Sequence, residues 1–197
     1  MGMAEAERDA RERLIEGTRA LLWERGYLGT SPTAIWRAAG VGQGSMYHHF
    51  RGKPDLVLAA EQRAAEAMQR DIRACFAAEG PAYQRISAYL RRERDALRGC
   101  PVGRLVADPE IAADERLRQP ARDTFAVLHQ CLESAIEEGQ AAGEFGPGLD
   151  AAQTASALAA VIQGGYTLAR AEGAAAPFER AIVGALALLR ASRPAGQ

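Results

Sequence analysis

Residues 30–50 read TSPTAIWRAAGVGQGSMYHHF. Ser31 before Pro32 indicates a helix start, because a serine side chain caps free backbone N–H groups and proline suits the first helical position. This short helix is expected over residues 32–39 and ends at Gly40, and a second short helix is expected over 43–49. A longer helix is expected before them, over residues 4–25. This order is the plan of a helix-turn-helix motif.

The second short helix has two chemically different faces. The side chains expected to point outward are Gln43, Ser45, Tyr47 and His48. Met46 and Phe50 fall on the opposite side and are expected to pack inward. Hydrogen-bonding groups of the outward kind suit base edges and phosphates, so this helix is predicted to read DNA.

Composition extends the helical interpretation to the whole chain. The 197 residues suffice for one to two domains. Alanine, the strongest helix former, occurs 42 times, whereas valine, isoleucine and threonine together occur only 21 times. We therefore expect an all-α fold of about nine helices, which excludes a β-sandwich or a dinucleotide-binding α/β domain. The further helices are expected over residues 54–77, 81–98, 120–143, 150–172 and 177–191.

Charge and cysteine content narrow the class of protein. The net charge is −1, but residues 1–53 carry +2, which allows a local basic patch and excludes a histone-like coat. Three widely spaced cysteines suit neither a disulfide framework nor a zinc site. Residues 151–169 carry no formal charge yet contain several polar side chains. We interpret them as a buried helix, and expect a soluble, cytoplasmic protein that does not span a membrane.

Residues 26–56 resemble the TetR family of bacterial transcriptional regulators, through the run from Gly26 to Ser31, the AGVGQGSMYHHF segment and Lys53-Pro54-Asp55-Leu56. The resemblance implies a helix-turn-helix domain over residues 1–52 and a ligand-binding and dimerisation domain over 53–197. It also assigns contacts to double-stranded DNA. Ser31 and Thr33 are expected to contact phosphate, and Gln43 and Ser45 to face bases, with Gly44 in the same set. The residues expected to hold the DNA backbone are Tyr47, His48 and Lys53.

Three positions in this segment bear on the expected contacts with DNA. Lys53 is the only lysine of the chain and precedes Pro54, where its ammonium and a helix N-terminus can share one phosphate. Gly42 stands where the family usually has a small hydroxyl residue. Glycine is an acceptable N-cap, but one backbone contact to DNA is lost. Trp36 replaces a smaller residue, and either packs in the core or touches the DNA backbone.

The C-terminal half resembles the LmrA/YxaF-like branch of the same family, through residues 99–103 and 163–170. This resemblance implies a small-molecule effector, and the few charges on these faces favour an apolar or aromatic one. The candidate pocket residues are Tyr89, Leu105, Phe125, His129, Gln163 and Tyr166. The last two helices are expected to form a homodimer interface, which suits a palindromic operator. Its candidate residues are Ala155, Ala159, Ile162, Phe178, Ile182, Leu186 and Leu189.

Other functions remain as alternatives. No catalytic triad order, metal-ligand spacing or phosphate loop is present, so an enzyme, a metal site and a cofactor are not expected. His48 and His49 point about 100° apart on a helix, which disfavours a shared metal ion. A helical small-molecule-binding protein with an idle DNA motif stays open. So does a thiol-redox sensor using Cys100, which lies between Arg98 and Arg104. The favoured hypothesis is a ligand-released repressor.

Overall fold

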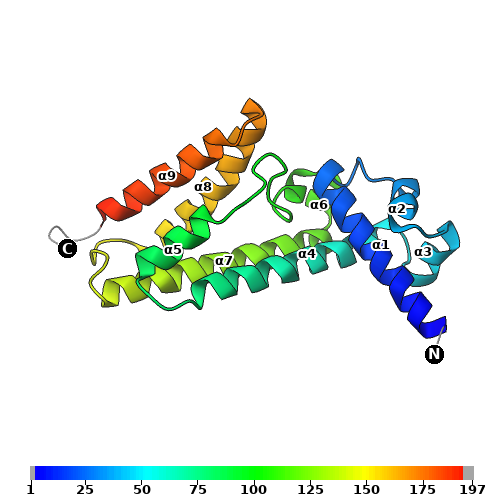
Figure 1. The fold of residues 1–197 in the computed structure, drawn as a ribbon, viewed down its shortest axis with the longest axis horizontal. Coiled ribbons are helices and arrows are strands. Elements are labelled where there is room, and N and C mark those ends of the chain that lie inside the picture. Colours follow the sequence, from blue (N-terminus) through cyan, green and yellow to red (C-terminus); the bar gives the residue numbers. More distant parts are fainter. Residues whose placement is uncertain (1–2, 193–197) are drawn as a thin grey trace. The chain divides into compact units, whose positions relative to one another are not determined.

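The computed structural model describes residues 3–192, which form α-helices joined by loops (Figure 1). In chain order the elements are α1 (Met3–Arg25), α2 (Pro32–Ala39), α3 (Gln43–His49), α4 (Lys53–Phe76), α5 (Ala82–Arg91), the short 3-10 helix η1 (Leu105–Ala107), α6 (Pro109–Ala113), α7 (Glu115–Ala141), α8 (Ala151–Glu172) and α9 (Ala176–Ala191). No strand occurs among the residues described. The predicted all-α fold with about nine helices is confirmed.

The chain forms two compact units. The N-terminal unit comprises the described residues of Met1–Ala67 together with Pro101–Asp123. The C-terminal unit comprises Met68–Cys100 and the described residues of Thr124–Gln197. This division differs from the expected boundary after residue 52, because the first part of α4 and residues 101–123 join the N-terminal helices. Both segments supply apolar side chains to the N-terminal core, among them Val57, Leu105 and Ile111.

The core of the N-terminal unit fixes the two short helices. Ile35 of α2 and Met46 of α3 are fully buried, and Phe50 directly after α3 is 5% exposed. They pack with apolar side chains of α1 that include Leu14 and Leu22. Helices of seven or eight residues are too short to be stable alone, so this burial, rather than helix propensity, holds α2 and α3 in place.

Two glycines serve the turn after α2 and its contact with α1. Gly40 adopts a left-handed conformation with φ of 61° and ends α2, and the following amide of Val41 donates a hydrogen bond to the Trp36 carbonyl at 3.1 Å. A Cβ on Gly17 of α1 would lie only 3.2 Å from the backbone nitrogen of Ala39. The sequence therefore sets both the sharp turn and the small distance between the helices.

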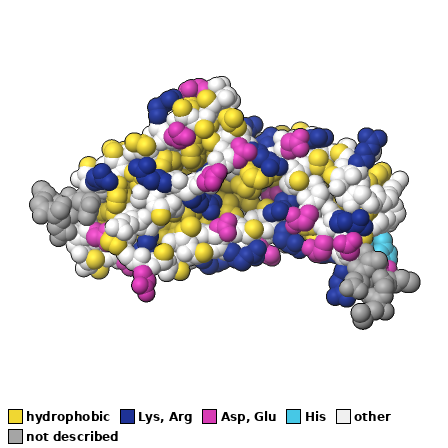
Figure 2. All heavy atoms as spheres, in the orientation of Figure 1, with side chains coloured by type: hydrophobic (Ala, Val, Ile, Leu, Met, Phe, Trp, Pro, Cys, Tyr) yellow, Lys and Arg dark blue, Asp and Glu magenta, His cyan; other side chains and the backbone are white. Residues whose placement is uncertain are grey.

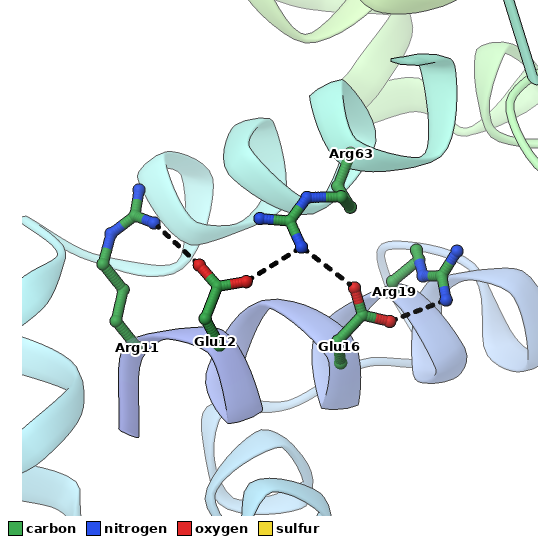
Figure 3. Close-up of polar contacts among 5 residues, drawn as sticks. All are labelled: Arg11, Glu12, Glu16, Arg19 and Arg63. Atoms are coloured by element: carbon green, nitrogen blue, oxygen red, sulfur yellow. Dashed lines mark hydrogen bonds and ion pairs between the residues drawn. The ribbon is translucent and has the colours of Figure 1, made fainter. Parts of the chain in front are cut away.

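An ion-pair network joins α1 to α4 (Figure 3). One guanidinium nitrogen of Arg63 lies 2.8 Å from Glu12 and 3.4 Å from Glu16, and these glutamates also pair with Arg11 and Arg19. The hydrogen bond from Arg63 lowers the pKa of Glu12. Because these side chains are substantially exposed, each pair contributes at most about 1 kcal/mol. The network orients the two helices more than it stabilises them.

In the C-terminal unit, α8 and α9 pack along each other (Figure 1). The Asp150 carboxylate caps α8 by accepting the Gln153 amide at 2.8 Å. A Cβ on Gly165 would lie 2.9 Å from the ring of Phe178 on α9, so glycine is needed where the helices meet. The rings of Tyr166 and Phe178 are 4.7 Å apart at their centroids. These contacts form an apolar seam between the two helices.

Two sequence-based expectations about helix ends are wrong. α5 ends at Arg91 instead of residue 98, and Leu97 lies beyond it with an exposed fraction of 47%. The Arg94 guanidinium donates to the carbonyls of Tyr89 and Leu90 at 2.7 and 2.8 Å, which satisfies the last turn of a shorter helix. α7 begins at Glu115 instead of Pro120, because Asp114 accepts the Arg116 amide at 2.9 Å, and the proline then costs one helical hydrogen bond.

Glu61 of α4 gives a pH-dependent prediction. Its side chain is 2% exposed, and burial raises the pKa of Glu61 from 4.5 to about 8. Between these values the folded protein holds a proton that the unfolded chain has lost, so stability falls as the pH rises from about 4.5 to 8. We expect Glu61→Gln, which keeps the neutral form, to be more stable than the parent at pH 8 by roughly 2–5 kcal/mol.

Urea unfolding at pH 5, 7 and 8.5 measures this effect. Glu66→Gln is the matched control, since Glu66 is exposed on the same helix. The control should follow the parent at every pH, whereas the stability gained by Glu61→Gln should grow with pH. A gain that is the same at all three pH values would contradict a buried, protonated Glu61.

Candidate nucleic-acid interface

The structure confirms the two faces expected for α3. Met46 is fully buried, while Gln43, Tyr47 and His48 are exposed and Ser45 is half-buried. Gly44 is exposed, and a Cβ built on it would meet no atom within 4 Å. The first turn of α3 therefore presents a flat, open surface. A surface of this kind lets a base edge or a phosphate approach the helix closely.

The start of α2 belongs to the same unit and is capped as expected. The Ser31 hydroxyl accepts the Ala34 amide at 3.2 Å, and its own hydrogen remains available to a phosphate. Thr33 is exposed. The Gly42 cap of α3 makes no side-chain hydrogen bond, as its identity requires. The predicted phosphate contacts of Ser31 and Thr33 stay predictions.

Trp36 takes part in packing, the first of the two alternatives for this position. It is half-buried and packs against the N-terminal core. Its indole N–H donates to the Met46 sulfur at 3.1 Å and so joins α2 to α3 directly. The larger side chain fills the space between the two helices, and its polar atom is used within the protein.

Lys53 is placed differently from a free phosphate-binding lysine. It begins α4, and its ammonium donates to the Tyr27 carbonyl at 2.7 Å and lies 3.8 Å from the centre of the Tyr27 ring. Burial lowers the pKa of Lys53, although the nearby carboxylates of Asp108 and Glu110 oppose this shift. The ammonium is thus engaged with the loop after α1. A phosphate would have to share it, through the donors that remain.

Asp108 also supports the loop after α1, a role that was not predicted from the sequence. One carboxylate oxygen accepts the amides of Tyr27 and Leu28, each at 3.1 Å, and the other accepts the Glu110 amide that begins α6. One side chain therefore caps a helix and fixes the loop that leads into α2. The Asp108-Pro109 pair is a sequence signal for the cap, but nothing in the sequence indicates the contact with residues 27 and 28.

Charge is dispersed over the surface. Figure 2 shows Lys and Arg side chains interspersed with Asp and Glu over the visible face, in agreement with the near-neutral composition. On the segment that carries α2 and α3, Arg37 and Arg51 are exposed and residues 28–53 contain no acidic side chain. This local excess of positive charge is the kind of patch that attracts a phosphate backbone.

The candidate pocket residues do not form one group. Leu105 is 1% exposed within the hydrophobic core of the N-terminal unit, apart from the other candidates. The other five lie in the C-terminal unit. Tyr89 and Tyr166 are buried there, whereas Phe125, His129 and Gln163 are half-buried. The Tyr89 hydroxyl and the Gln163 side-chain nitrogen have no hydrogen-bond partner although both atoms are buried.

The seven candidate interface residues are used inside the chain. All are buried, with exposed fractions between 1% and 6%: Ala155, Ala159, Ile162, Phe178, Ile182, Leu186 and Leu189. In the single chain they expose little surface to a second copy, and their role at an interface stays a prediction. Both helices also carry exposed apolar side chains, Leu168 on α8 and Val183 and Leu188 on α9.

Neither a metal site nor a membrane span is found in the described part of the chain. No group of three His, Cys, Asp or Glu side chains there is placed to hold a metal ion. None of the described helices is both long and apolar enough to cross a bilayer. Cys100 is 2% exposed, and its sulfur lies 4.0 Å from that of Met68, so burial shields it from dissolved oxidants.

Comparison with known proteins agrees with this geometry. Residues 14–60 match the family described as bacterial regulatory proteins, tetR family, and residues 82–185 match the description Tetracyclin repressor-like, C-terminal domain. The fold and its exposed reading helix define a helix-turn-helix transcriptional regulator that binds DNA. Since the two matched segments together cover most of the chain, the protein belongs to the TetR family.

Individual relatives support the same assignment. LmrA of Bacillus subtilis (strain 168) is 28% identical over 124 residues, or 59% of this chain and 65% of LmrA, slightly under two thirds of its length. The repressor NemR of Escherichia coli (strain K12) is 30% identical over 66% of this chain and 71% of NemR. A TetR regulator from Chloroflexus aurantiacus J-10-FL has a similar structure, with a TM-score of 0.82 and 28% identity over 93% of this chain and 95% of that one. The expected likeness to the LmrA branch is confirmed.

Gly44 offers a test of the reading surface. We expect Gly44→Leu to fold as stably as the parent or slightly better, because nothing surrounds the position and glycine costs a helix about 0.5–1 kcal/mol. The same side chain should abolish close approach to DNA and weaken binding at least tenfold. Thermal unfolding and a DNA mobility shift measure the two effects.

Ala126→Leu is the matched control for this substitution. It adds a leucine at an exposed position on α7, in the C-terminal unit. The control should leave the affinity for DNA unchanged. Equal affinities of the two variants and the parent would show that α3 does not enter the groove.

Proposed function

We propose that this TetR-family regulator is a homodimeric repressor that binds a palindromic operator through α3 and is released by a small-molecule effector bound in its C-terminal unit. The observation that carries the DNA-binding part is the open polar face of α3, held outward by the burial of Met46. Gln43 and Ser45 are the base-reading candidates on that face, and Tyr47 and His48 the backbone-contacting ones. Binding chromosomal DNA implies a cytoplasmic location.

The dimer is proposed from apolar surface that the single chain leaves exposed. Leu168 on α8 is 52% exposed, and on α9 Val183 is 53% and Leu188 77% exposed. Small residues continue both stripes, with Gly164 on α8 and Gly184 on α9 open to solvent. Two adjacent helices with exposed apolar stripes of this kind fit a four-helix interface with the same helices of a second copy.

A dimer also explains how so short a reading helix achieves specificity. One seven-residue helix contacts few base pairs, whereas two such helices about 34 Å apart read two half-sites in successive major grooves. A two-fold symmetric protein requires a two-fold symmetric site. The operator is therefore proposed to be a palindrome.

Selection of bound DNA from a random pool tests the operator. We expect the purified protein to enrich a palindrome, and its affinity for that sequence to fall steeply with salt, by about 0.9 log units per neutralised phosphate for each log unit of salt. Enrichment of a sequence without two-fold symmetry would overturn the proposal that a symmetric dimer binds the operator. Failure of a folded protein to enrich any sequence would overturn the DNA-binding assignment of α3.

Leu188→Glu tests the interface. The parent residue is largely exposed in the single chain, so the variant should fold, while a carboxylate within an apolar interface should dissociate the dimer and weaken operator binding. Leu97→Glu is the control, because Leu97 is an exposed leucine of the same unit outside α8 and α9. Sedimentation measures the mass of each variant. Two variants with the same oligomeric state would refute this interface.

Ligand release requires that the effector prefer one of two states. A ligand that binds both states equally shifts nothing, whatever its affinity. The coupling between effector and operator is expected at about 1–3 kcal/mol, or roughly a 5- to 150-fold loss of operator affinity. An effector that binds the C-terminal unit without changing operator affinity would refute release by ligand.

A further inference from the structure

A cluster of two arginines and three aromatic rings lies within the C-terminal unit. The guanidinium carbons of Arg92 and Arg94 lie 4.9 and 5.1 Å from the centre of the Tyr89 ring. Arg94 is also 5.8 Å from the centre of the Phe178 ring, which stacks on Tyr166. We call these five residues the Arg92–Arg94 cluster. It joins the end of α5 to the seam between α8 and α9.

The positive charge of this cluster is poorly compensated. Arg94 is half-buried, and desolvation lowers its pKa, yet no carboxylate among the described residues lies within ion-pair distance of it. Its hydrogen bonds go to the backbone carbonyls of residues 89, 90 and 92. The carboxylate paired with Arg92 is that of Asp71, 3.9 Å away and 69% exposed. A desolvated cation without a close anion is costly, and an anionic ligand would remove that cost.

Unused hydrogen-bond donors point to the same ligand chemistry. The Tyr89 hydroxyl belongs to a fully buried side chain and has no partner, and Arg92 Nε is likewise buried without an acceptor. Gln163 Nε2, one helical turn before Tyr166 on α8, is a third such atom. All three atoms can donate. A group rich in acceptor oxygens, such as a carboxylate, is what they lack.

A cavity of about 390 Å³ opens beside the cluster. Arg92, Arg94 and Phe178 line it together with Leu90 and Ile182. Arg91, Glu93 and Glu179 also line it, and no ion pair links these glutamates to the arginines among the described contacts. The volume suits a molecule of one or two rings or a medium-length acyl chain. Leu90, Phe178 and Ile182 offer apolar contact for such a body.

We infer that the effector is an organic anion, in which a carboxylate binds the Arg92–Arg94 cluster and the Tyr89 hydroxyl while an apolar ring or chain packs against Phe178 and Ile182. This inference rests on the proposed function and narrows its ligand from an apolar or aromatic molecule to an amphiphilic acid. Arg92 forms the ionic contact, since the donors of Arg94 are largely occupied by backbone carbonyls. Tyr89 contributes a neutral hydrogen bond.

Matched acids and amides test the class of ligand. The probes are 2-naphthoate and decanoate, each compared with its neutral amide, and binding to the full-length protein is measured by calorimetry and thermal shift. We expect at least one acid to bind at least tenfold more tightly than its amide, and its affinity to fall with added salt. Equal binding of acid and amide, or no binding of either acid, overturns the inference.

Variants test the named residues. We expect Arg92→Gln to weaken binding of the tighter acid at least tenfold, and Tyr89→Phe to weaken it about three- to tenfold while the protein stays as stable as the parent, because that change removes only an unpartnered hydroxyl. Arg91→Gln is the control, since it removes an equal charge from an exposed residue that lines the same cavity. Equal losses of affinity in Arg91→Gln and Arg92→Gln would show that only the overall positive charge matters. That result would overturn a specific site at Arg92.

Operator binding is measured in the same samples, so that the two proposals can fail separately. If no acid binds and the protein still binds its selected DNA, the anion site is wrong and the proposed DNA-binding function is unaffected. If an acid binds through Arg92 and leaves operator affinity unchanged, the site is correct and ligand release by it is wrong.

Discussion

The burial of Met46 is the contact on which the DNA-reading surface depends. α3 has seven residues and no side-chain cap at its N-terminus, so it has little stability of its own. Its position is set by one fully buried side chain, by Phe50 at its end and by the hydrogen bond from Trp36 to the Met46 sulfur. Everything that α3 presents outward follows from this anchoring, because fixing one face of a helix fixes the other.

The loop before α2 needs a separate support, which comes from far along the chain. Asp108 holds the amides of residues 27 and 28, and Lys53 holds the carbonyl of residue 27. The guanidinium of Arg104 donates to the carbonyl of Trp23 near the end of α1. The N-terminal unit is therefore a reading motif completed by residues 101–123, and its integrity depends on both parts of the sequence.

The sequence predicts local structure well where one residue determines it. Ser31, Pro32 and Gly40 determine the ends of α2, and Met46 and Phe50, four residues apart, determine which face of α3 is buried. The end of α5 was not predictable, because it depends on a guanidinium folding back from Arg94. The burial of Leu105 in the N-terminal core could not be predicted for a related reason, because it depends on which distant segments pack together.

It is harder to predict from the sequence which face of an apolar helix is buried. α8 and α9 each bury one stripe against the other and leave a second one exposed, with Leu168 and Leu188 among its members. Alanine and glycine occur on both stripes, although the buried one carries more of the large apolar side chains. The close fit of Gly165 against Phe178 fixes how the inner stripes meet, and that fit is a property of the packed pair.

The chain itself offers a connection between ligand and DNA. Arg92 and Arg94 lie in the non-helical segment that follows α5, and this segment continues into residues 101–123, where Asp108 holds the loop before α2. Ligand binding can act on this connection only through a difference in affinity between two arrangements of the segment. The proposed anion supplies such a difference, because it binds most tightly to the arrangement that presents the Arg92 guanidinium to the cavity.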